Sequence, residues 1–296
     1  MALTTNTPAQ TRRLTRRENV KAELAITTAS DDALFDRLID QASRAIERYC
    51  RRPFPREVYT ETLGGFGEVE LMLARTPIVA VSSVLYDLDV ITDYVVNDAD
   101  AGILYRQVGW FWTAQVLSGL VGKQRWPGIG DPLPRQEEPR FTVGYTAGYL
   151  LPSQDLVGGT VSVAAADSSF NDSASGFPKL LQAGDLLVAS GFQQAANNGT
   201  FAVVGAPSAG KVRANAVLAD EAAGAGKLLQ VSSLPPDIEK AAIETVKAWY
   251  IDRQKSPHTR RERVSDLDME WTDPVGVESG LPVNAAALLR PYVRAA

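Results

Sequence analysis

Residues 31–52 restrict the fold more than any other segment, because they can bury an apolar face only as one long helix. Asp31 can cap the start, and Pro53 forces a stop by removing Arg52 from the helical region. Arg48 and Arg51 lie where the negative end of the helix dipole favours cations. Apolar side chains recur at three- and four-residue intervals: Leu34, Leu38, Ile39, Ala42, Ala45, Ile46, Tyr49 and Cys50. None of these residues has catalytic chemistry, so the helix indicates packing or assembly.

Two further segments predict helices that can pack against the first. Residues 15–25 begin with Thr15 and Glu18, which have the spacing of a capping box. Residues 238–254 follow Pro235-Pro236-Asp237, a strong start signal, and Ser256-Pro257 marks their stop. The helices at 31–52 and 238–254 are predicted to form a pair, although residues 53–237 lie between them.

Between residues 57 and 145 the sequence changes to short segments rich in β-branched and aromatic residues. We predict strands at 57–63, 69–73, 78–86, 94–96, 103–105 and 140–145, which together form a compact antiparallel sheet or a small barrel. Residues 1–13 are polar and predicted to be disordered. Residues 118–139 are interrupted repeatedly by proline and glycine and predict a long exposed loop.

Residues 156–233 differ in composition from the rest of the chain. Only nine of these 78 residues are charged, about half the 22% of the whole chain, and all five tryptophans and nine tyrosines lie elsewhere. Alternating runs separated by Gly, Asn and Ser turns predict an all-β domain. Helix-initiating sequences occur both before it, at 149–155, and after it, at 234–237. We therefore predict an α+β protein in which residues 1–155 and 234–296 form one domain and residues 156–233 an inserted β domain.

Few residues of the chain suit catalysis or metal binding. Cys50 is the only cysteine, which excludes an intramolecular disulfide and a thiolate metal cage. His258 is the only histidine and has no nucleophile motif near it. Asp98 and Asp100 resemble the start of a calcium loop, but Gly109 stands where a bidentate glutamate is required. We predict no catalytic residue, no metal ligand and no cofactor.

Two alternatives with a different chemistry stay open at this point. Glu68 with Glu70, or Asp87 with Asp89, could serve a glycan-cleaving enzyme as paired carboxylates. A DNA-binding regulator could use the basic residues of two clusters, although interleaved acidic residues favour a solvated or protein-contacting face. These clusters are Arg12, Arg13, Arg16 and Arg17, and Arg253, Lys255, Arg260, Arg261 and Arg263.

The overall charge and the hydropathy limit the kinds of partner that the chain is expected to bind. The formal net charge of -5 gives no general reason for nucleic-acid or acidic-membrane binding. No run approaches the ~20 apolar residues of a membrane span, and the N-terminus has no apolar targeting segment. We expect synthesis in a reducing cytoplasm and no membrane partner.

The order of these elements resembles the head–tail connector (adaptor, or head-completion) proteins of tailed bacteriophages and related gene-transfer particles. The short helix precedes a long helix that ends in Tyr49-Cys50-Arg51-Arg52-Pro53-Phe54. The strands end in Phe141-Thr142-Val143-Gly144-Tyr145, and a Pro-Pro-Asp-led helix carries Trp249-Tyr250 and Arg253. The resemblance covers about residues 14–155 and 234–256, and more loosely the tail.

The resemblance implies a ring, usually of twelve subunits, in the virion neck between the portal and the stopper or tail-completion protein. Double-stranded DNA would pass through its channel without sequence-specific binding, during head completion and genome ejection. A tail terminator or tail-tube protein is the structural alternative. The implied subunit-packing residues are Leu34, Leu38, Tyr49, Val246, Trp249 and Tyr250. The implied portal-binding residues are Leu288, Leu289, Arg290, Pro291, Tyr292, Val293 and Arg294, in a tail expected to bury little of its surface in its own subunit.

Overall fold

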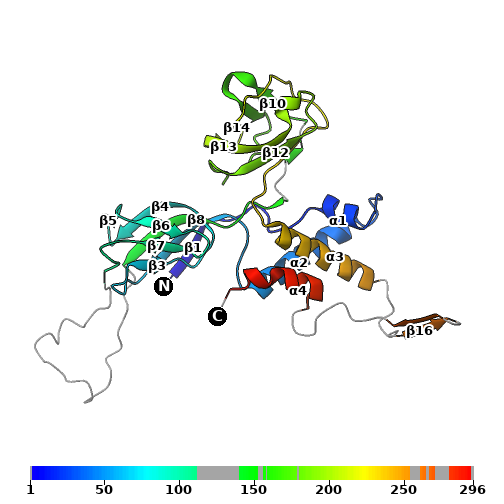
Figure 1. Cartoon of the computed structure of the whole chain (residues 1–296), viewed down its shortest axis with the longest axis horizontal. Coiled ribbons are helices and arrows are strands. Elements are labelled where there is room, and N and C mark those ends of the chain that lie inside the picture. Colours follow the sequence, from blue (N-terminus) through cyan, green and yellow to red (C-terminus); the bar gives the residue numbers. More distant parts are fainter. Residues whose placement is uncertain are drawn as a thin grey trace, which may run out of the picture. The chain divides into compact units, whose positions relative to one another are not determined.

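The chain is an α+β protein whose helices and antiparallel sheets fall into two compact units (Figure 1). The computed structural model describes residues 2–111, 140–152, 156–157, 159–178, 180–253, 261–264, 267–270 and 280–294. The first unit comprises Met1–Ala9 and Arg56–Gly148, and the second comprises Gln10–Pro55 and Tyr149–Ala296. The predicted fold class is confirmed. The loop predicted at 118–139 lies outside the described residues.

A five-stranded antiparallel sheet forms the centre of the first unit. Its order is β1 (Ala2–Thr7), β2 (Glu57–Leu63), β8 (Phe141–Ala147), β4 (Ile78–Tyr86) and β5 (Asp89–Val90). The expected disorder of the N-terminus is wrong for residues 2–7, because β1 pairs with β2 from Ala2 opposite Thr62 to Thr7 opposite Val58. The free edge of β2 supplies the hydrogen-bond partners that a polar, threonine-rich segment lacks by itself.

A smaller antiparallel sheet completes the first unit. It has the order β3 (Glu70–Met72), β7 (Ile103–Tyr105) and β6 (Val95–Asp98). Leu71 and Leu104 are opposite each other and point into a core that also contains Trp110 and Phe141. Those four side chains are almost entirely buried, so one face of this sheet covers the core. The other face is described below.

Four helices form a core in the second unit: α1 (Arg17–Glu23), α2 (Asp32–Cys50), α3 (Pro236–Asp252) and α4 (Val283–Leu289). The helices predicted at 15–25, 31–52 and 238–254 correspond to α1, α2 and α3. The predicted caps are wrong, because neither Thr15 nor Asp31 makes a side-chain cap bond. Contacts with α3 use these polar atoms instead: the Thr15 hydroxyl donates to Glu239, and Asp31 accepts from Tyr250.

The C-terminal segment forms α4 and the single-turn helix η5 (Arg290–Tyr292), neither of which the sequence pattern predicted. Leu281, Ala285 and Leu289 are fully buried in a cluster with Ile46 and Ile238. The expectation that this tail buries little surface in its own chain is therefore wrong. It contains enough apolar positions at helical spacing to cover the ends of α2 and α3.

Residues 156–230 contribute a seven-stranded antiparallel sheet with its own hydrophobic core. The strands are β9 (Leu156–Val157), β10 (Val161–Ala164), β11 (Ser169–Asp172), β12 (Leu186–Ser190), β13 (Gly199–Ser208), β14 (Lys211–Ala214) and β15 (Leu228–Gln230), in the order β10-β11-β14-β13-β12-β15-β9. Phe170 stacks near Phe192 and Phe201 in the core. A separate core supports the proposed inserted domain at 156–233, whose boundaries stay a prediction.

The remaining elements are short. The one-turn helices η3 (Ala165–Asp167) and η4 (Ala195–Asn197) lie between strands of the seven-stranded sheet. A two-stranded hairpin, β16 (Arg261–Val264) and β17 (Leu267–Glu270), follows α3. None of the helices in the described ranges combines the length and the apolar character that crossing a membrane requires.

Candidate functional site

The most distinctive surface of the helical core is a basic stripe on α2, which we define as Arg37, Gln41, Arg44, Arg48 and Arg51. All five residues are exposed. The first four are spaced alternately by four and three residues, so on a helix of 3.6 residues per turn they share an arc of about 60°. Arg51 is the left-handed C-cap that follows α2. Among the described residues none of the four stripe arginines forms an ion pair. A row of unneutralised guanidinium groups therefore faces outward on a chain whose net charge is -5.

The acidic residues of α2 lie beside the stripe and are already paired within the chain. Arg13 contacts Asp36 at 3.0 Å and Asp40 at 2.8 Å, and Arg12 contacts Glu47 at 3.4 Å. The hydrogen bonds that Arg13 donates to Asp40, with the charges of both aspartates, raise the pKa of Arg13. The first basic cluster of the sequence thus ties the N-terminal arm to α2. The stripe keeps its positive charge because these carboxylates are occupied elsewhere.

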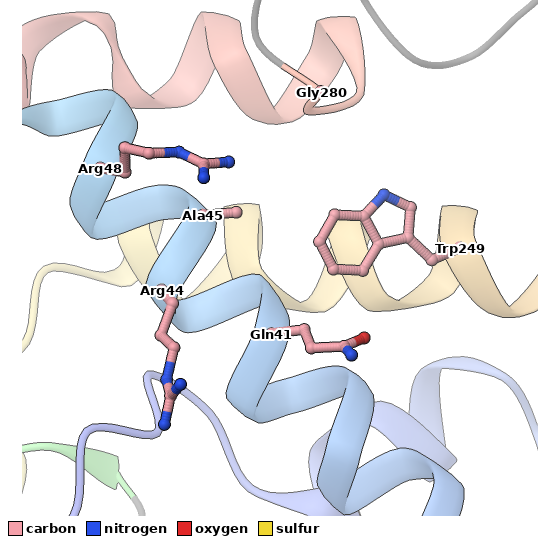
Figure 2. A pocket seen from close by; sticks show the side chains of 6 residues that line it. All are labelled: Gln41, Arg44, Ala45, Arg48, Trp249 and Gly280. Atoms are coloured by element: carbon pink, nitrogen blue, oxygen red, sulfur yellow. The ribbon is translucent and has the colours of Figure 1, made fainter.

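A pocket of about 460 Å³ adjoins the stripe, between α2, α3 and the residue that leads into α4. Its lining consists of Gln41, Arg44, Ala45, Arg48, Trp249 and Gly280. Figure 2 shows Gln41 and Arg48 extending toward the side on which the Trp249 indole lies, whereas Arg44 turns away from it. Trp249 is only partly buried. An aromatic wall beside arginine side chains is the composition of protein interface hot spots.

The α2–α3 pair that holds this pocket is fixed at its far end by polar contacts. The Tyr250 hydroxyl donates to Asp31 at 2.8 Å, and the Tyr250 ring lies 4.8 Å from that of Phe35. Glu23 of α1 accepts from Lys240 at 3.1 Å and Lys247 at 3.2 Å, which lowers the pKa of Glu23. Trp249 is therefore positioned by α3, which these contacts of Lys240, Lys247 and Tyr250 hold against α1 and α2.

The six predicted subunit-packing residues divide into two groups. Leu38, Val246 and Tyr250 are buried in the cluster between α2 and α3 of the same chain. Leu34, Tyr49 and Trp249 are partly exposed. A role in contacts between subunits stays a proposal for all six, and only the second group has surface available without rearrangement.

The predicted portal-binding residues lie in α4, in η5 and just after them. Leu289 is fully buried, and Leu288 and Tyr292 pack partly against the same cluster. The side chains of Arg290, Pro291, Val293 and Arg294 are exposed, and the Arg294 backbone N–H donates to the Cys50 carbonyl at 3.1 Å. Portal binding by this segment stays a prediction. The exposed residues are the ones that can contact a portal without rearrangement of the chain.

The residues weighed for chemistry occupy separate places. The Cys50 thiol is buried, and burial raises its pKa to about 12, against the smaller effect of Arg52. Asp98 accepts from the Ala101 N–H at 2.8 Å in the turn between β6 and β7, and Asp87 pairs with Arg140 at 3.5 Å.

Other residues named for chemistry are not gathered into a site. Glu68, Glu70 and Asp89 are exposed. In the ranges that the structure describes, no group of three or more His, Cys, Asp and Glu residues is placed to hold a metal ion. His258 and Arg260 lie outside these ranges, as do the side chains of Arg261 and Arg263.

Sequence reasoning missed the stripe residues Arg37 and Arg44. The signal was present, because arginine or glutamine recurs at 37, 41, 44, 48 and 51 with heptad-like spacing and no carboxylate intervenes on that arc. From the sequence pattern alone, this row is indistinguishable from the solvated face of any amphipathic helix. The structure shows that Asp36 and Asp40 are already paired with Arg13, so they do not neutralise the stripe arginines beside them.

The fold and this surface define a protein built to contact other macromolecules, with no assembled catalytic centre among the described residues. Residues 18–81 match the family of phage gp6-like head-tail connector proteins, over α1, α2, β2, β3 and the start of β4. The predicted resemblance is confirmed over this segment.

The other comparisons add little. No curated protein matches the chain. Among solved structures, a chain described as the neck of an empty GTA particle computed with C6 symmetry aligns with 100% of this chain and 97% of its own length. The TM-score is 0.34 and the sequence identity is 11%.

Proposed function

We propose that this chain forms a ring, of twelve copies as the resemblance implies, between the portal and the stopper or tail-completion protein. The ring extends and seals the channel through which double-stranded DNA leaves during genome ejection. The observation that carries the proposal is the connector match over residues 18–81, which includes the whole of α2 and its basic stripe. Ring formation requires each subunit to offer two contact surfaces, and an exposed charged stripe beside a tryptophan pocket is suited to be one of them.

The C-terminal segment is proposed to contact the portal through its exposed residues. Arg290 and Val293 project from a short segment whose other side is held by buried Leu289. Docked in this way, the segment is already ordered before it meets its partner. Binding then avoids much of the conformational entropy that a disordered tail would lose.

The direct test is reconstitution on DNA-filled heads that carry the portal but lack this protein. Addition of the purified chain is expected to give a ring at the portal vertex in electron micrographs and to improve DNA retention once the stopper is added. A chain that leaves the portal vertex bare refutes the proposal. A chain that binds only the end of isolated tail tubes instead supports the tail-terminator alternative.

The tail is tested by point substitution, because truncation after residue 285 would also remove Leu289 from the hydrophobic core. Arg290→Glu with Val293→Asp is expected to weaken portal binding without lowering the melting temperature. Val283→Asp, at an exposed position that begins α4, is the matched control for added negative charge. Equal portal binding by both variants refutes the portal role of the tail but leaves ring formation untouched.

A further inference from the structure

The small sheet of the first unit has an uncovered face, which we call the acidic sheet face: Glu70, Met72, Val95, Asp98, Ile103 and Tyr105. Residues opposite each other in antiparallel strands project to the same side. Tyr105 is opposite both Glu70 and Val95, and Ile103 is opposite both Met72 and Asp98. The six side chains therefore form two rows on one surface. Met72 and Val95 are 61% and 57% exposed, which is unusual for apolar side chains in a sheet.

The charge of this face complements the basic stripe. Its two charged side chains, Glu70 and Asp98, are both carboxylates and stand at opposite corners, with four apolar or aromatic residues between them. With strands ~4.8 Å apart and ~3.3 Å per residue, the two corners are separated by roughly 12 Å. Two stripe arginines seven residues apart, such as Arg37 and Arg44, are separated by about 10.5 Å along α2. The spacings agree to within the reach of an arginine side chain.

We propose that the basic stripe and Trp249 pocket of one subunit bind the acidic sheet face of the next copy of this chain. This inference rests on the proposed ring and assigns the two surfaces that build it. The surfaces belong to different units of the chain and share no residue, so one copy can use both at once. Such head-to-tail contacts close into a ring when the rotation between neighbours permits. The apolar residues between the carboxylates lie against the pocket wall, and arginine–carboxylate pairs fix the register.

A second copy is favoured over DNA by the chemistry of the surface. Phosphate binding needs cations but gains little from a tryptophan pocket beside them. No second aromatic residue of the pocket lining is present for base stacking. The complementary apolar and acidic surface, by contrast, is present on the chain itself.

Disulfide trapping tests the contact directly. The chain's own Cys50 is buried, so an introduced cysteine is the only accessible thiol. Gln41→Cys in one preparation and Met72→Cys in another, mixed on portal-bearing heads, are expected to give a disulfide-linked dimer. Gln41→Cys mixed with Val217→Cys is the matched control, since Val217 is 86% exposed but lies on neither surface. Each single variant alone is expected to give no dimer, because the contact joins two different surfaces.

Charge reversal supplies the second arm. Arg44→Glu with Arg48→Glu is expected to lower the trapped yield about tenfold, and Glu70→Arg with Asp98→Arg to do the same. Mixed together, the two reversed chains bring opposite charges together at both contacts, the native stripe against the native face and the Glu stripe against the Arg face, and are expected to recover assembly that neither chain shows alone. A ring that assembles with the Gln41–Met72 yield no higher than the Val217 control overturns this inference while the proposed function stands. Stripe reversal that weakens double-stranded DNA binding and leaves trapping unchanged also overturns it. Absence of any wild-type ring refutes the proposed function itself.

Discussion

The buried ion pair of the inserted β sheet yields a prediction whose size follows from the structure. Lys227 Nζ lies 2.9 Å from Glu221 Oε1, with only 5% and 9% of the two side chains exposed. Glu221 also accepts from the backbone N–H groups of Gln193 and Gln194 at 3.0 and 3.1 Å, and from the Asn197 amide at 3.0 Å. One carboxylate therefore connects the loop after β12 to the segment before β15.

Replacement of Glu221 by glutamine keeps the shape but leaves the ammonium of Lys227 buried without a counter-ion. Loss of one partner of a buried pair costs about 3–5 kcal/mol of unfolding free energy. Lys227→Met added to Glu221→Gln is expected to recover much of this loss, because the second change removes the uncompensated charge. Lys211→Met, which breaks the more exposed pair with Asp167, is the matched control and is expected to have little effect.

Hydrogen exchange of peptides covering residues 186–231, followed against urea, measures this loss within the insert. All tryptophans lie outside residues 156–233, so tryptophan fluorescence reports the rest of the chain independently. We expect faster exchange in the insert of Glu221→Gln and an unchanged fluorescence transition. The reasoning is refuted if Glu221→Gln and Lys211→Met accelerate exchange equally, or if the double variant is less stable than Glu221→Gln.

Three further predictions concern other buried groups and pH. Burial raises the pKa of Glu221, but hydrogen bonds from Lys227, Gln193, Gln194 and Asn197 lower it to about 2, below the ordinary value near 4.5. The insert is therefore expected to keep this stabilisation above pH 4.5 and to lose it as the pH falls toward 2. Hydrogen exchange of the insert measures the loss, and equal stability at pH 4.5 and near pH 2 contradicts the prediction. Native Cys50 is expected to resist thiol reagents at pH 8 and to react once the chain is unfolded, whereas equal rates would show that the thiol is accessible. Leu289→Ala is expected to lower the unfolding free energy by about 2–5 kcal/mol, with exposed Val293→Ala as the control in the same denaturation series.

The parts of the fold that the sequence predicted are those whose signal is local. The buried face of α2 repeats over five turns, and the Pro-Pro-Asp start of α3 is independent of any partner. The strands at 57–63 and 78–86 were predicted with the observed bounds because their β-branched and aromatic residues lie between clear turns. Local patterns sufficed for these elements because each buries a continuous face.

The parts that were missed depend on surfaces contributed by distant residues. The helix α4 has only seven residues, and its apolar positions become a pattern only when α2 and α3 supply the surface they cover. The strand β1 exists because β2 offers an open edge. The same limit applies to the site. A row of arginines on α2 resembles any solvated helix face until Arg13 is seen to occupy Asp36 and Asp40.

The proposed contact between copies also connects the charge of the chain to the passage of DNA. A free basic stripe would attract phosphates, which conflicts with a channel that must release its DNA quickly. When the stripe of each subunit is covered by its neighbour, the two carboxylates of the acidic sheet face pair with two of the four arginines, and the covered charges are removed from solvent. The surface left to the channel and the exterior then carries the acidic excess behind the net charge of -5. In the proposed ring, this contact is therefore expected to give a channel that binds DNA less strongly than the isolated subunits do. Salt should weaken ring assembly for the same reason, since screening acts on the pairs that hold it together.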